Sequence, residues 1–205
     1  MNQILINSHV SYFNKTLPPL LNSLSASGCP NTNITVIITD ATGSVDTSSF
    51  VGIGIKTVPY NNFDYSALRW VGEQDNLPYT HFINLHDTVT VQPHFWSTVK
   101  DIKDIKSMVA FASLNIGIYP VDVLPRMVPL LSSITNKIQA IVNQDFVFKR
   151  IHHFCPSFGH KKIMVGEDNF YGTSNLRRVE LYPDMGIIKY HSNDGRQMAP
   201  VKWSL

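Results

Sequence analysis

The sequence is poor in cysteine and in clustered charge, and both shortages narrow its possible functions. Its 205 residues include only two cysteines, Cys29 and Cys155. Two thiols so far apart match no metal-binding or redox motif and favour reduced cysteines in a reducing compartment. Charged residues make up 16% of the chain, and no run of lysine or arginine is longer than two residues. A protein that binds nucleic acid usually carries a clustered basic face, so we do not expect that function.

Long apolar runs are also absent. No stretch of about 18 apolar residues occurs, so the sequence predicts no membrane span. The N-terminus begins at once with the strand-like residues Ile4, Leu5 and Ile6. It lacks the basic region and the long apolar stretch of a signal peptide. We therefore expect a cytoplasmic protein.

Three common motifs of nucleotide-binding proteins and hydrolases are missing. No Gly-x-Gly-x-x-Gly follows the first strand pattern, which argues against a dinucleotide site. No lysine-bearing phosphate loop and no Gly-x-Ser-x-Gly nucleophile turn occur either.

The chain does contain a regular alternation of strand and helix patterns. Hydrophobic residues make up 43%, which is enough for one domain with a buried core and a cleft. Strand patterns fall on residues 3–7, 34–39, 51–58, 80–85, 108–119, 163–165 and 186–191, and helix patterns on 12–25, 64–72, 93–103 and 125–142. This order predicts an α/β domain of Rossmann-like type, with a central, mostly parallel mixed sheet flanked by helices.

Polar clusters follow four of the predicted strands. They are Ser8 with His9, Asp40, His86 with Asp87, and Glu167 with Asp168. Sheets of this kind bind ligands beyond the carboxyl ends of their strands. We therefore expect these clusters to converge on one edge of the sheet.

Asp87 and His191 are the candidate metal ligands. A carboxylate at a strand end suits a hard divalent cation, which keeps some waters and substrate phosphate oxygens as further ligands. A histidine at a later strand end can complete such a site, because imidazole binds transition ions such as Mn²⁺. The alternatives are that Asp87 caps a turn and that His191 is an ordinary polar residue.

Glu167 and Asp168 are the candidate catalytic residues. They lie between Gly166 and an aromatic pair, directly after an apolar strand pattern. One of the two carboxylates could accept the proton of an attacking hydroxyl group. The alternative is a helix start, where acidic residues are favoured electrostatically.

A nucleotide would be contacted by side chains near the ends of the first strands. The candidates are Ser8, His9, Tyr12, Asp40, Asp64, Tyr65, Arg69 and His86. Asp40 could accept hydrogen bonds from a ribose hydroxyl or a base N–H. Arg69 could bind a diphosphate, or could instead pair with Glu73 one helical turn further on.

Together these segments resemble the nucleotide-sugar glycosyltransferases of the GT-A fold. Residues 40–44 resemble the family's turn after the second strand, which contacts the base, and residues 85–89 resemble its DxD segment. Residues 166–168 resemble the later acidic motif that faces the acceptor, and His191 falls where many members place a C-terminal metal-binding histidine. The small size and the His-Asp-Thr variant also resemble the glycosyltransferase domain of chlorella viruses, which would place the protein in host cytoplasm.

The resemblance implies a reaction. A sugar would move from a UDP-sugar donor to a glycan or glycoprotein acceptor, with Mn²⁺ or Mg²⁺ bridging Asp87, His191 and the donor diphosphate. Asp168 would be the general base if the anomeric centre is inverted, and Glu167 would hold the acceptor. The sequence departs from the family in one respect, because residues 85–88 contain one carboxylate where the DxD motif has two.

The resemblance also divides the chain. Residues 1–205 would be one glycosyltransferase domain, with a nucleotide-binding half at 1–105 and an acceptor-side half at 106–205, and it could be one module of a longer chain. Two alternatives remain open. One is a sugar nucleotidyltransferase, although its usual glycine-rich, basic first loop is missing here, and the other is a non-catalytic module that binds a nucleotide or a sugar.

Overall fold

The computed structural model describes residues 2–102, 109–113, 116–140, 163–165 and 177–192. A six-stranded sheet forms its centre, with the strand order β3-β2-β1-β4-β7-β6. The strands are β1 (Asn2–His9), β2 (Ile34–Thr39), β3 (Gly54–Thr57), β4 (His81–His86), β6 (Val109–Ser113) and β7 (Ile116–Pro120). Strands β3, β2, β1 and β4 pair in parallel, whereas β7 pairs antiparallel with β4 and β6. The predicted α/β fold with a mostly parallel mixed sheet is confirmed.

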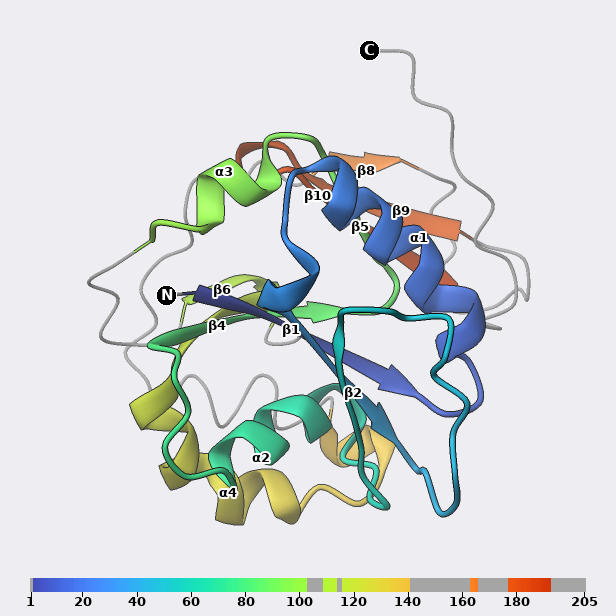
Figure 1. Cartoon of the computed structure of the whole chain (residues 1–205), viewed down its shortest axis with the longest axis vertical. Coiled ribbons are helices and arrows are strands. Elements are labelled where there is room, and N and C mark those ends of the chain that lie inside the picture. Colours follow the sequence, from blue (N-terminus) through green and yellow to red (C-terminus); the bar gives the residue numbers. More distant parts are fainter. Residues whose placement is uncertain (1, 103–108, 114–115, 141–162, 166–176, 193–205) are drawn as a thin grey trace.

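Helices cover both faces of this sheet (Figure 1). The helix α1 (Phe13–Ala26) lies on one face, and α2 (Ser66–Gly72) and α4 (Leu124–Ser132) lie together on the other. Side chains of β1 alternate between the two faces, as a strand requires. Ile4 belongs to the buried cluster that includes Leu17 of α1, whereas Leu5 belongs to the one that includes Leu68 of α2. β1 is therefore buried on both sides, as the central strand of such a sheet must be.

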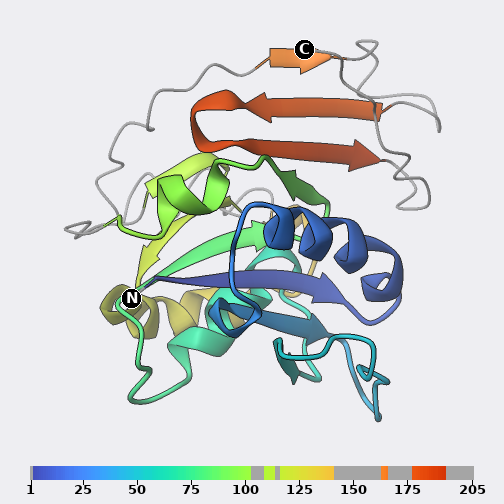
Figure 2. The ribbon, with the colours of Figure 1, turned by 45° about the horizontal axis from the view of Figure 1, so that its top comes forward.

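A second, antiparallel sheet lies above the first in Figure 2 and was not predicted from the sequence. Its strand order is β5-β10-β9-β8, formed by β5 (Val89–Val91), β8 (Ile163–Val165), β9 (Arg177–Tyr182) and β10 (Ile187–Ser192). β5 begins three residues after the end of β4, so its partner β10 lies next to the end of the central sheet. The backbone N–H of Tyr190 donates to the carbonyl of Thr88 at 2.9 Å.

The remaining elements are short. They are α3 (Phe95–Val99) and the 3-10 turns η1 (Asn31–Asn33), η2 (Phe63–Tyr65), η3 (Val121–Val123) and η4 (Pro183–Met185). None of the helices in the described ranges is long and apolar enough to cross a membrane.

Two predicted helices are shorter in the structure. The helix predicted over residues 93–103 is reduced to α3, which ends at Val99. The helix predicted from residue 125 to 142 is interrupted after Ser132, and residues 137–140 are helical again. Asn136 begins this new turn, since its Oδ1 accepts from the backbone N–H of Gln139 at 2.9 Å.

The apolar segment 108–119, predicted to include a buried strand, contains two antiparallel strands, β6 and β7. The strands β5 and β9 had not been predicted at all. An apolar run does not show where a chain reverses, and a strand of three residues is too short to give a periodic signal.

Gly72 allows α2 and α4 to pack closely. A Cβ atom at this position would lie 2.6 Å from Cγ2 of Val128 and 2.7 Å from the carbonyl oxygen of Leu124. We predict that Gly72→Ala lowers the free energy of unfolding by about 1–3 kcal/mol, because the two helices must move apart. Urea denaturation measures this change. Gly43→Ala is the control, since nothing lies within 4 Å of the added methyl group; equal effects of the two substitutions would contradict the prediction.

Candidate functional site

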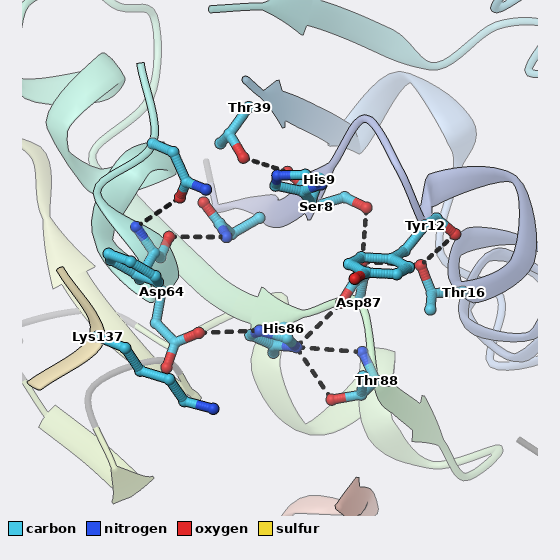
Figure 3. A pocket seen from close by; sticks show the side chains of 13 residues that line it. Ser8, His9, Tyr12, Thr16, Thr39, Asp64, His86, Asp87, Thr88 and Lys137 are labelled. Carbon is cyan, nitrogen blue, oxygen red and sulfur yellow. Dashed lines mark hydrogen bonds and ion pairs between the residues drawn. The ribbon is translucent and has the colours of Figure 1, made fainter. Parts of the chain in front are cut away.

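A pocket of about 520 Å³ opens at the carboxyl ends of β1, β2 and β4 (Figure 3). The chain runs from β1 outward to β2 and β3 on one side and then returns to place β4 on the other side of β1. Such a reversal of strand order leaves a crevice in which α/β proteins bind their ligands. The pocket is lined by Asn7, Ser8, His9, Tyr12, Thr16, Thr39, Asn61, Phe63, Asp64, His86, Asp87, Thr88 and Lys137.

Asp87 forms the buried floor of this pocket, with 5% of its surface exposed. Its Oδ2 accepts hydrogen bonds from the hydroxyls of Ser8 at 2.6 Å and Thr16 at 2.7 Å. Its Oδ1 lies 3.0 Å from Nδ1 of His86. Burial alone would raise the pKa of Asp87, but the adjacent His86 and the three hydrogen bonds lower it below its ordinary value. Asp87 is therefore an ionised carboxylate.

His86 joins Asp87 to a second carboxylate. Its Nε2 lies 2.9 Å from Oδ1 of Asp64, so each ring nitrogen faces an acidic side chain (Figure 3). Burial lowers the pKa of His86, but the charges of Asp64 and Asp87 outweigh this effect and raise it to about 10. The two carboxylates therefore favour the protonated form of His86, and its Nδ1 also lies 2.9 Å from the hydroxyl oxygen and 3.3 Å from the backbone nitrogen of Thr88.

The loop that carries Asp64 is held by Asn7, a buried residue near the end of β1. Nδ2 of Asn7 donates to the carbonyl of Phe63 at 3.1 Å, and its Oδ1 accepts from the backbone N–H of Ala67 at 3.0 Å. Phe63 has a φ of 56°, a conformation that is strained for a bulky residue. The backbone N–H of Phe63 also donates to Oδ1 of Asn61 at 2.8 Å. Strained residues persist where the surroundings fix them, and they are enriched at binding sites.

His9, Tyr12 and Asp40 lie at the rim. Nδ1 of His9 accepts from the backbone N–H of Ser11 at 3.0 Å, so the other nitrogen carries the proton and donates to Oδ2 of Asp40 at 3.2 Å. The rings of His9 and Tyr12 are 5.5 Å apart, and Tyr12 is 47% exposed. Asp40 has a φ of 61°, which directs the chain away from β2 at this edge. An exposed aromatic ring beside polar groups suits the flat face of a base or a sugar.

The structure brings most of the predicted nucleotide-binding residues together. The pocket lining includes Ser8, His9, Tyr12, Asp64, His86 and Asp87. Asp40, Tyr65 and Arg69 are not among the lining residues, although Asp40 contacts the lining residue His9. Tyr65 is fully buried and donates from its hydroxyl to the carbonyl of Ala140 at 3.3 Å. Arg69 forms an ion pair with Glu73 at 2.7 Å and stacks on the ring of Tyr60. Of the two roles considered for this arginine, pairing with Glu73 is therefore the one observed.

The predicted catalytic pair, Glu167 and Asp168, lies outside the described residues. His191 is in β10, and its neighbour Tyr190 is hydrogen-bonded to Thr88 beside Asp87. The backbone at His191 therefore runs close to the predicted metal ligand, while its side chain is not among those described.

The described side chains do not by themselves form a metal site. Within the described ranges, no group of three or more histidine, cysteine, aspartate or glutamate residues is placed to hold an ion. Asp87 already accepts three hydrogen bonds, and His86 occupies the space between Asp87 and the second carboxylate, Asp64. These side chains do not fit a divalent ion in this arrangement.

Several pocket residues had not been singled out from the sequence, namely Asn7, Thr16, Thr39, Asn61, Phe63, Thr88 and Lys137. Thr16 lies one helical turn after Tyr12, and this spacing could have suggested that both face the same cleft. Lys137 gives no such signal, because nothing near it in the sequence links it to the other pocket residues.

No protein-family model matches this chain, and no curated protein matches its sequence. Solved structures give matches of low similarity. An active-site mutant of LgtC has a TM-score of 0.46 and 14% identity, and the match covers 71% of this chain and 70% of LgtC. S. aureus TarS has a TM-score of 0.38 and 14% identity, covering 70% of this chain and 34% of TarS.

A 1–349 fragment of S. aureus TarS in complex with UDP has a TM-score of 0.36 and 13% identity, covering 69% of this chain and 55% of the fragment. This chain thus spans only about a third of TarS and about half of its fragment. All these similarities are weak, and none of them supports a conclusion about the function of this chain.

The charge on His86 predicts a pH-dependent contribution to stability. Because the folded chain raises the pKa of His86 from 6.5 to about 10, this contribution is complete below pH 6.5 and is lost as the pH rises toward 10. The lowered pKa of Asp87 affects stability in a different pH range. The stabilisation that it gives the folded chain is present at neutral pH and is lost as the pH falls into the acidic range.

We therefore predict that wild type and His86→Asn differ most in free energy of unfolding at about pH 6, and that the difference shrinks by at most about 1.4 kcal/mol per pH unit on going to about pH 9. Urea denaturation at a series of pH values measures both proteins. Subtracting the free energy of unfolding of the variant from that of the wild type removes the contributions of groups that titrate alike in both proteins. A difference that does not change with pH would contradict a charged His86.

Proposed function

We propose that this chain is a glycosyltransferase that moves a sugar from a UDP-sugar to a glycan or glycoprotein acceptor. The observation that carries the proposal is the pocket at the reversal of strand order. It gathers six of the residues that the sequence singled out for nucleotide or metal binding, which come from three segments of the chain. Its volume lies within the range of small-molecule sites, which is about 300–1,000 Å³.

Different side chains of the pocket would have different roles in binding the donor. The exposed ring of Tyr12, with His9 and Asp40 beside it, would receive the base and ribose of the donor. The floor formed by Ser8, Thr16 and Asp87 is fully hydrogen-bonded within the protein and would act as a rigid support rather than as a reacting group. A support of this kind keeps the donor in one position, and positioning supplies a large part of many rate enhancements.

The acceptor side of the proposal rests on the sequence. Asp168 would take the proton of the acceptor hydroxyl if the anomeric centre is inverted, and Glu167 would hold the acceptor. In a reaction that retains configuration, Asp168 would instead contact the donor sugar. A panel of nucleotide-sugars tests the proposal, with free sugar, transferred sugar and nucleotide separated by chromatography.

We expect one UDP-sugar to be turned over fastest, and we expect Asp168→Asn to slow that turnover at least about a hundredfold if Asp168 is the base. A folded protein that binds UDP but turns over no donor would identify a non-catalytic binding module. Formation of a nucleotide-sugar from a sugar phosphate and a nucleoside triphosphate would identify a nucleotidyltransferase. Either result would overturn the proposed activity.

Dependence on Mn²⁺ or Mg²⁺ is a separate part of the proposal, with Asp87 and His191 as the ligands that the sequence suggests. The hydrogen bonds on Asp87 oppose direct binding of an ion unless Ser8, Thr16 or His86 moves away. Calorimetric titration of UDP, with Mn²⁺ and then with a chelator, tests this part. If the site depends on a metal ion, UDP should bind more tightly with Mn²⁺ than with the chelator. Equal affinity for UDP under both conditions would contradict metal dependence but not the proposed nucleotide pocket.

A further inference from the structure

Lys137 lies at the edge of the pocket, on the side of Asp64 and His86 (Figure 3). It comes from the segment after α4, more than 45 residues beyond every other residue that lines the pocket. Its side chain is exposed. A long cationic side chain at the mouth of a cleft can reach a ligand without the cost of being buried beforehand.

The other charged side chains that line the pocket are already paired with one another. Asp64, His86 and Asp87 form a chain of two carboxylates and one imidazolium, and His9 donates to Asp40 at the rim. Lys137, in contrast, forms no ion pair or hydrogen bond with any other residue in the described ranges. Among the described lining residues it therefore provides the cation that a ligand can use.

The backbone around Lys137 is held in place although its side chain is free. The carbonyl of Ile134 accepts from Nδ2 of Asn62 at 2.8 Å, and the carbonyl of Ala140 accepts from the hydroxyl of Tyr65. Between these anchors, Oε1 of Gln139 accepts from the backbone N–H of Thr135 at 2.8 Å. The loop that carries Asn62 also carries Asp64, so the two walls of the pocket are tied together and the position of the lysine is fixed relative to His86.

We propose that Lys137 binds the phosphate groups of the nucleoside diphosphate in this pocket. The inference rests on the proposed function and adds to it the residue that distinguishes a diphosphate from an uncharged nucleoside. An ammonium group and a phosphate oxygen form a charge-assisted hydrogen bond, which is stronger than a neutral one. In the reaction, the same contact would stabilise the negative charge that grows on the nucleotide as it leaves the sugar.

Three ligands that differ only in phosphate content test this assignment, namely uridine, UMP and UDP. Their dissociation constants are measured calorimetrically on wild type, Lys137→Met and Lys137→Arg. The control is Lys100→Met, which removes another exposed lysine that does not line the pocket. Thermal unfolding of each variant shows that the fold is retained.

We expect Lys137→Met to weaken UDP binding about tenfold or more, because a charged hydrogen bond is lost. The affinity of Lys137→Met for uridine should equal that of the wild type, and its loss of affinity for UMP should be no larger than its loss for UDP. Lys137→Arg should retain most of the wild-type affinity for UDP. Lys100→Met should bind all three ligands as wild type does.

Two results would overturn the assignment while leaving the proposed function intact. One is wild-type affinity of Lys137→Met for UDP, and the other is an equal loss for uridine and UDP, which would show that Lys137 shapes the pocket without contacting phosphate. If the wild-type protein does not bind UDP at all, the result would instead contradict the proposed function, and with it the assignment of Lys137.

Discussion

A carboxylate that is withdrawn from water needs hydrogen-bond donors around it, because an unpaired buried charge costs several kcal/mol. Asp87 obtains its donors from three elements: Ser8 at the end of β1, Thr16 in the first turns of α1, and His86 at the end of β4. These contacts fix β1, α1 and β4 relative to one another at the edge where the pocket opens. The shape of the pocket is therefore set by its buried carboxylate, before any ligand is present.

The pairing of the strands makes this arrangement possible. In the register of β1 with β4, Asn7 lies opposite His86, and in the register of β1 with β2, His9 lies opposite Thr39. All three strands therefore end at nearly the same level, and the polar residues that follow them meet. Parallel pairing is what creates this single edge, because antiparallel neighbours would send alternate strand ends to opposite sides of the sheet.

The sequence was sufficient to predict that the clusters after β1, β2 and β4 lie at one edge, since strand patterns and the polar residues after them can be read locally; the fourth predicted cluster, Glu167 with Asp168, lies outside the described residues. It was not sufficient to predict the contacts within it. Thr16 and Asp87 are 71 residues apart, and no local pattern links a helix hydroxyl to that carboxylate. The second sheet was missed for a similar reason, because β5 is stabilised by its distant partner β10 and not by its own three residues. Arg69 had two possible partners in the sequence, and only packing could decide that Glu73 binds it.

The balance of charge in the pocket determines what a donor nucleotide would meet there. The imidazolium of His86 is shared between two carboxylates, so it has no proton left to offer a phosphate oxygen. The segment His86-Asp87 thus places a histidine ring of the protein between two carboxylates, those of Asp64 and Asp87. Negative charge brought by a diphosphate would then need a cation outside this set of paired side chains. Lys137 is the cation that the described residues place there, and any ion that also binds would be held jointly by the ligand and by groups beyond this internally paired floor.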